Sequence, residues 1–334
     1  MGRRSTKPAL LQKTTQVFAV HQIPLECDVY SADDYPADAP VFLFFHSGGL
    51  VCGAREAVPP WLVQTCYRRK WPLISASYRL LPQADGPALY DDAKAAFGFS
   101  QTLGGHVRRV IAGGASAGFF LATLLAHYET PKPIALLSIT GIPTFRHPFF
   151  NSSKLIPPDP ITEDEIEPFV AEPVSVGKSV ANTLDVFDID KLRPDGARNP
   201  IYKPTALPSR LDQNSTRGLL YDYYLYNNMY CDLAGTVDPG FLWPREFKVP
   251  SQWPVTIFIQ GDQDVDVSPR VSIDVAAKLG QTAVYCEAKG QEHLFESRSF
   301  LDSTDMNQNE GNPMAAVVRA IEALDKAVGA SPES

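Results

Sequence analysis

A short apolar run, Val41-Phe42-Leu43-Phe44-Phe45, is the sequence feature that most constrains how this chain can fold. An apolar run without alternation, bounded by turn residues, is typical of a strand that is covered on both faces, as in a parallel sheet. Other segments repeat the pattern, at 72–78, 107–112, 134–140, 255–260 and 283–287. We therefore expect the core to be built on a mostly parallel sheet.

Segments with helical character lie between several of these strands, at 88–102, 117–129, 268–279 and 313–328. Because strands alternate with helices, the sequence predicts an α/β fold with helices on both faces of the sheet. Residues 16–30 alternate loosely between apolar and polar side chains, which predicts one or two edge strands before the core.

The alternation of strands and helices stops between residues 142 and 250. This stretch is rich in proline and contains the aromatic segment 221–230. A structureless loop of that length is improbable in a compact domain, so we interpret 142–250 as an inserted cap or lid. The core is then expected to consist of 1–141 and 251–334.

Composition limits the partners of the chain. The formal net charge of -8 and the lack of a basic cluster argue against a nucleic-acid partner and favour a small neutral or apolar substrate. The five cysteines are scattered and odd in number, which predicts free thiols and a reducing compartment. No apolar run has the length of a signal peptide or a membrane span, so we expect a cytoplasmic protein. Whether it forms a homodimer is left open.

The string Gly114-Ala115-Ser116-Ala117-Gly118 follows a strand-like segment and precedes a helix-like one. This is the setting of a nucleophile elbow, in which two glycines allow a sharp turn and the serine hydroxyl projects above the sheet. A serine needs a base to take its proton and donors to stabilise the oxyanion that its attack creates. Ser116 is therefore the predicted nucleophile.

The expected oxyanion donors are the backbone N–H groups of Gly48, Gly49 and Ala117, since His46-Ser47-Gly48-Gly49 directly follows the buried strand. The acid and the base should follow the serine, in loops after later strands. His293 is the only histidine after position 147 and is the predicted base. The preceding loop offers three possible acids, and the residues alone do not choose among them: Asp262, Asp264 and Asp266.

No cofactor or metal is predicted. Cysteine and histidine residues do not occur at metal-ligand spacing, and the glycines at 113–118 lack the Gly-x-Gly-x-x-Gly spacing of a dinucleotide site.

Together these motifs resemble the hormone-sensitive-lipase-like branch of the α/β-hydrolase fold family, a group of carboxylesterases and lipases. His46-Ser47-Gly48-Gly49 is similar to its His-Gly-Gly-Gly oxyanion motif, with Ser47 in place of the first glycine. Residues 77–82, Ser-Tyr-Arg-Leu-Leu-Pro, are similar to its Asp-Tyr-Arg-Leu-Ala-Pro stretch, and Tyr90-Asp91-Asp92-Ala93 to the helix start that follows. The resemblance implies that Asp264 is the catalytic acid beside Ser116 and His293.

The resemblance implies a serine hydrolase that cleaves carboxylic esters, lactones or thioesters through an acyl-enzyme. Two alternatives keep the fold. The first is a biosynthetic enzyme of fungal-type specialised metabolism, a lactonase, acyltransferase or cyclase that holds a bulky substrate under a tyrosine-rich cap. The second is a non-catalytic ligand receptor, which the presence of His293 disfavours.

Overall fold

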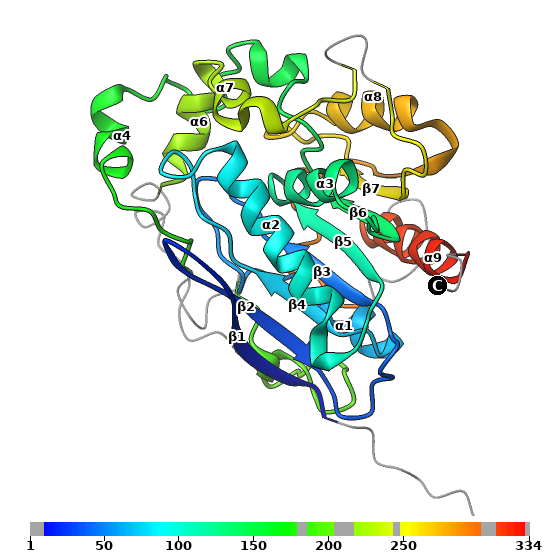
Figure 1. Ribbon diagram of the computed structural model, residues 1–334. Coiled ribbons are helices and arrows are strands. Elements are labelled where there is room, and N and C mark those ends of the chain that lie inside the picture. The colour runs from blue at the N-terminus through cyan, green and yellow to red at the C-terminus, as the bar shows by residue number, and fades with distance from the viewer. Residues whose placement is uncertain (1–9, 179–185, 204–216, 243–247, 302–311, 331–334) are drawn as a thin grey trace, which may run out of the picture.

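An eight-stranded sheet forms the centre of the computed structural model, which describes residues 10–178, 186–203, 217–242, 248–301 and 312–330 (Figure 1). The strand order is β1-β2-β4-β3-β5-β6-β7-β8. Strand β2 pairs antiparallel with β1 and β4, and the other neighbours pair in parallel. The expected α/β fold with a mostly parallel sheet is confirmed. The strands are β1 (Gln12–His21), β2 (Ile23–Ser31), β3 (Val41–Phe45), β4 (Leu73–Ala76), β5 (Val110–Ala115), β6 (Ala135–Ile139), β7 (Val255–Gly261) and β8 (Ala283–Ala288).

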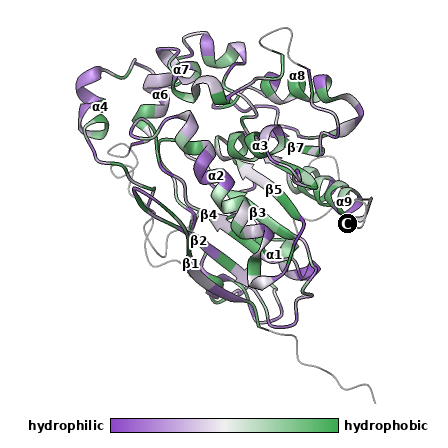
Figure 2. Cartoon of the chain, viewed as in Figure 1, coloured by the Kyte–Doolittle hydropathy of each residue, from purple (hydrophilic) through white to green (hydrophobic). Residues whose placement is uncertain are grey.

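The apolar run at 41–45 is strand β3, and its residues alternate between two separate cores. Val41, Leu43 and Phe45 face one cluster of buried apolar side chains, whereas Phe42 and Phe44 face the other. All five residues are inaccessible to solvent, so an apolar side chain is stabilised at every position. Figure 2 shows the contrast with the outer strand β1, which is largely hydrophilic.

Helices cover both faces of the sheet, as predicted. Residues of α2, α3 and α8 belong to the first cluster, and residues of α1 and α9 belong to the second. Of the described helices, none is both long and apolar enough to cross a membrane. The helices are α1 (Pro60–Arg69), α2 (Gly86–Gln101), α3 (Gly118–Tyr128), α4 (Glu163–Val170), α6 (Leu219–Tyr226), α7 (Tyr230–Ala234), α8 (Pro269–Leu279) and α9 (Met314–Ala330).

Two elements differ from the sequence-based expectation. Helix α1 was not predicted, because its buried surface includes the polar residues Gln64 and Thr65 among apolar ones. The strand expected at 107–112 is β5, which begins at Val110 and continues to Ala115. Val107 is 93% exposed and lies outside the sheet.

The described parts of residues 142–250 lie in two places. Helices α4, α6 and α7 lie together beyond one end of the sheet, at the top of Figure 1. The segment 186–203 instead packs beside α1, where the amide of Gln64 donates to the carbonyl of Gly196 at 2.8 Å. Residues 179–185, 204–216 and 243–247 of this range lie outside the described residues.

Helix α3 begins in direct backbone contact with the end of β3. A Cβ placed on Gly118 would lie 2.3 Å from the carbonyl oxygen of Phe45 and 2.4 Å from that of His46, closer than any real Cβ approaches. Gly114 is equally constrained, because its Cβ would lie 2.3 Å from the carbonyl carbon of Gly118. The two glycines of the Gly-x-Ser-x-Gly string are therefore required by close packing.

A pair of glycine substitutions tests this packing. We expect Gly118→Ala to lower the free energy of unfolding by about 1–3 kcal/mol, the usual cost of forcing atoms into a packed interior. Gly98→Ala, in an exposed part of α2 with no atom within 4 Å of the added Cβ, should raise it by about 0.5–1 kcal/mol. Urea denaturation measures both changes. Equal effects of the two substitutions would contradict the packing argument.

Candidate active site

Ser116 occupies the turn between β5 and α3 in a strained backbone conformation. Its φ of 49° lies in the left-handed region, which is uncommon for a residue with a side chain. Its N–H donates to the carbonyl of Ile139 at 2.9 Å, which ties the turn to the neighbouring strand β6. Ser116 is 5% exposed, and it lines a cavity at this end of the sheet.

His293, from the loop after β8, lines this cavity and forms a hydrogen-bonded pair with Asp264, from the loop after β7. The Nδ1 of His293 lies 2.8 Å from Oδ2 of Asp264. Asp264 also accepts the N–H of Val267 at 2.8 Å and the amide of Gln260 at 2.9 Å. Because the carboxylate accepts, Nδ1 of His293 carries the proton and Nε2 is the free basic nitrogen.

The surroundings of His293 favour its protonated form. Burial lowers the pKa of the ring, because it disfavours the charged form. The hydrogen bond to Asp264 and its negative charge raise the pKa, and Asp266 and Glu296 raise it further by smaller amounts. The balance raises the pKa of His293 above its ordinary value of 6.5.

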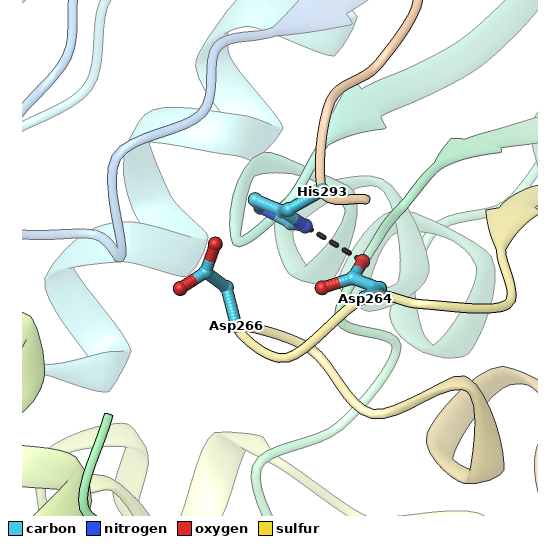
Figure 3. A group of neighbouring side chains, drawn as sticks. All are labelled: Asp264, Asp266 and His293. Atoms are coloured by element: carbon cyan, nitrogen blue, oxygen red, sulfur yellow. Dashed lines mark hydrogen bonds and ion pairs between the residues drawn. The ribbon is translucent and has the colours of Figure 1, made fainter. Parts of the chain in front are cut away.

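The three aspartates left open by the sequence lie in different environments. Asp264 is hydrogen-bonded to His293, whereas Asp262 accepts the N–H of Gly290 at 2.6 Å and forms an ion pair with Lys289. Asp266 lines the cavity. Figure 3 shows the carboxylates of Asp264 and Asp266 approaching His293 from different directions.

Asp264, Asp266 and His293 each place one potential metal-ligand atom within 4.8 Å of the others. Both oxygens of Asp264 already accept hydrogen bonds from protein groups. This arrangement suits a carboxylate that orients a histidine better than one that coordinates a metal.

The loop after β3 fixes the direction of the Gly49 N–H. The carbonyl of Gly48 accepts the N–H groups of Val51 at 3.0 Å and Cys52 at 2.9 Å. The C=O and N–H of a trans peptide point in opposite directions, so the Gly49 N–H points away from these partners. Within the described part of the chain, it has no hydrogen-bond acceptor.

The Ala117 N–H is directed in the same way. The carbonyl of Ser116, which belongs to the same peptide unit, accepts the N–H of Ile142 at 2.9 Å and that of Phe119 at 3.1 Å. Among the described residues, the Ala117 N–H likewise has no acceptor.

His46 fixes the Ser47–Gly48 peptide unit, which precedes the Gly48–Gly49 unit in this loop. Its Nδ1 donates to the carbonyl of Ser47 at 2.8 Å, which orients the N–H of Gly48. Its ring is fully buried and stacks on Tyr78, with ring centroids 4.2 Å apart. Burial lowers the pKa of His46 to about 4, so the ring is neutral at physiological pH and is suited to an orienting role.

The cavity has a volume of about 250 Å³ and brings Gly48, Gly49, Ser116 and His293 to a common space. Asp266, one of the three candidate acids, also lines the cavity. The sequence did not single out the other lining residues as site residues: Ser47, Cys52, Gly218, Tyr221 and Leu294. Tyr221 belongs to the aromatic segment 221–230, which is the only sequence signal that pointed toward it.

Comparison with known sequences supports the assignment of the fold. A sequence model of the α/β-hydrolase fold family matches residues 42–152. The chain is 34% identical over 104 residues to "Lipase 2" of Moraxella sp., covering 30% of this chain and 24% of that protein. It is 28% identical over 194 residues to "Carboxylic ester hydrolase LipN" of Mycobacterium tuberculosis, covering 47% of this chain and 50% of that protein. The matches thus span half or less of these curated relatives.

Solved structures match nearly the whole chain. An α/β hydrolase superfamily protein from Enterococcus faecalis superposes with a TM-score of 0.62 at 16% identity, covering 94% of this chain and 97% of that one. Carboxyl esterase 2 from Tuber melanosporum superposes with a TM-score of 0.56 at 15% identity, covering 97% of this chain and 89% of that one. With the family-model match at 42–152, these likenesses show that the chain has the α/β-hydrolase fold, and its matched segment is similar to lipases and carboxylic ester hydrolases of that fold.

Proposed function

We propose that the chain is a serine hydrolase that cleaves carboxylic esters, with Ser116 as nucleophile, His293 as base and Asp264 as the acid that orients His293. The observation that carries the proposal is that Ser116 and His293 line one cavity and that His293 is hydrogen-bonded to Asp264. Within the described residues, the backbone N–H groups of Gly49 and Ala117 have no acceptor. Relatives named lipase and carboxylic ester hydrolase support the same reaction.

The reaction would proceed through an acyl-enzyme. The Oγ of Ser116 attacks the ester carbonyl while Nε2 of His293 takes the hydroxyl proton, and Asp264 holds the ring in the required tautomer. The negative oxygen of the tetrahedral intermediate accepts hydrogen bonds from the oxyanion donors, Gly48, Gly49 and Ala117. The C–O bond to the alcohol breaks, and His293 returns the proton to the departing oxygen. Water then repeats the sequence, which releases the acid and restores Ser116.

Two observations favour ester hydrolysis over the other functions considered. The described cavity of about 250 Å³ is smaller than a typical site for a large ligand, which argues against a bulky polycyclic substrate. A non-catalytic receptor has no need of a base. In this chain His293 is oriented by the carboxylate of Asp264, which is itself hydrogen-bonded to Gln260 and Val267, as expected for a histidine that accepts a proton.

Removal of the nucleophile tests the proposal most directly. We expect Ser116→Ala to reduce kcat for p-nitrophenyl acetate by roughly 10³-fold or more and to abolish labelling by a fluorophosphonate. Ser152→Ala, at an exposed serine that does not line the cavity, serves as the matched control and should keep both properties. Labelling of the Ser116→Ala variant at the wild-type level would refute the assignment.

The acid is tested by pH dependence. Because the pKa of His293 is raised above 6.5, kcat/KM should fall on the acid side with a midpoint above pH 6.5, where His293 becomes protonated and cannot accept a proton. Asp264→Asn should shift this midpoint to lower pH, since it removes the charge that favours the protonated ring, and should lower kcat by roughly 10³–10⁴-fold. Asp262→Asn, in the same loop, should change neither. Loss of activity in Asp262→Asn alone would assign the acid to Asp262.

We also propose that α4, α6 and α7 form the cap over this cavity, a smaller unit than the range 142–250. Two tyrosines of the cap contact the loops of the site. The hydroxyl of Tyr230 donates to the carbonyl of Gly49 at 2.7 Å, and that of Tyr221 donates to the carbonyl of Asp266 at 2.6 Å. The cap would therefore support the oxyanion loop as well as cover it.

The support from the cap is tested by removing one hydroxyl. Tyr230→Phe leaves the Gly49 carbonyl without its buried donor, and we expect kcat to fall about tenfold while KM changes little. Tyr223→Phe is the matched control, since Tyr223 is a partly buried residue of α6 whose hydroxyl is paired with Glu163 and which does not line the cavity. Steady-state kinetics on p-nitrophenyl acetate measure both. An unchanged kcat in Tyr230→Phe would limit the cap to a covering role.

A further inference from the structure

Asp266 gives the cavity a charge that the proposed reaction does not require. It is the only acidic residue among the described residues that line the cavity, and no lysine or arginine lines it there. The rest of the lining is small, polar or apolar, and most of its surface is apolar. A substrate in this space therefore meets one negative charge close to Ser116 and His293.

The backbone of Asp266 is held by the proposed cap. The hydroxyl of Tyr221 donates to the backbone carbonyl of Asp266 at 2.6 Å, and Tyr221 itself lines the cavity with the Asp266 side chain. A ligand atom of Asp266 lies within 4.8 Å of those of Asp264 and His293. An aromatic ring and a carboxylate thus border the same small space, a combination that binds organic cations through charge attraction and contact with the ring.

The surroundings of Asp266 supply little compensating charge. Burial raises its pKa, as do the negative charges of Asp264 and Glu292, and His293 is the one group that lowers it. The whole chain also carries a net charge of -8, which attracts cations. A cationic group on the substrate would supply the missing partner.

We propose that Asp266, with Tyr221, selects esters that carry an ammonium group near the scissile bond. This inference rests on the proposed ester hydrolysis and names its substrate class. It departs from the neutral or apolar substrate that the composition favoured, because the charge lies inside the cavity. Asp266 is a specificity residue in this proposal, while Ser116, His293 and Asp264 perform the reaction.

A pair of isosteric substrates separates charge from shape. Acetylcholine and 3,3-dimethylbutyl acetate differ only in a trimethylammonium group in place of a tert-butyl group. We expect the wild type to favour acetylcholine by about tenfold or more in kcat/KM at low ionic strength, and the preference to shrink as salt is added. Asp266→Asn should bring the ratio close to one. Asp266→Glu, which keeps the charge, should restore much of the preference, and Asp262→Asn should leave it at the wild-type value.

The ratio of kcat/KM for acetylcholine to kcat/KM for 3,3-dimethylbutyl acetate distinguishes substrate selectivity from a general effect on catalysis. If Asp266 only stabilised the protonated His293, its substitution would slow both esters equally and leave the ratio unchanged, which would overturn the inference. Tetramethylammonium gives a second readout: it should inhibit hydrolysis of p-nitrophenyl acetate competitively in the wild type and at least tenfold more weakly in Asp266→Asn.

The outcomes also separate this inference from the proposed function. Hydrolysis of p-nitrophenyl acetate without a preference for acetylcholine would overturn the cation selectivity and leave ester hydrolysis standing. A wild type that hydrolyses none of the three esters would overturn the proposed function, and the inference with it.

Discussion

The contact between the start of α3 and the end of β3 is the constraint on which the geometry of the site depends. Gly118 lies against the carbonyl oxygens of Phe45 and His46, so no side chain fits between the helix and the strand. Strands β3 and β5 are direct neighbours, with Phe45 opposite Gly114. The turn that carries Ser116 and the loop that carries Gly48 therefore start side by side at the carboxyl ends of two neighbouring strands.

Two histidines near this edge show how position decides the chemistry of one residue type. His46 is buried against Tyr78 and bonded to a backbone carbonyl, and the loss of hydration lowers its pKa to about 4. His293 is also buried, but the carboxylate of Asp264 reverses the direction of the shift. The first is suited to hold a peptide unit in place. The second can exchange a proton near neutral pH, as a general base must.

Buried parallel strands could be predicted because each one carries its own signature, as β3 does, and their order along the chain then indicated the fold. Helix α1 could not be predicted, since its buried Gln64 is satisfied by partners far along the chain, the carbonyl of Gly196 and the N–H of Leu301. The same limit applied to the aspartates. Which carboxylate faces His293 depends on where Gln260 and Val267 place their N–H groups, and spacing alone does not reveal this.

Arg217 connects the proposed cap to the core through both backbone and side-chain oxygens, the latter from Gln83 and Glu172. Its guanidinium also donates to three backbone carbonyls, those of Val51 after β3, Leu81 after β4 and Phe169 in the last turn of α4. The three contacts with carbonyl groups do not depend on the side chains at those positions, so these residues can vary while those contacts persist. A chimera that exchanged the cap for that of a relative would thus need to carry this arginine with it, whatever sequence surrounded it.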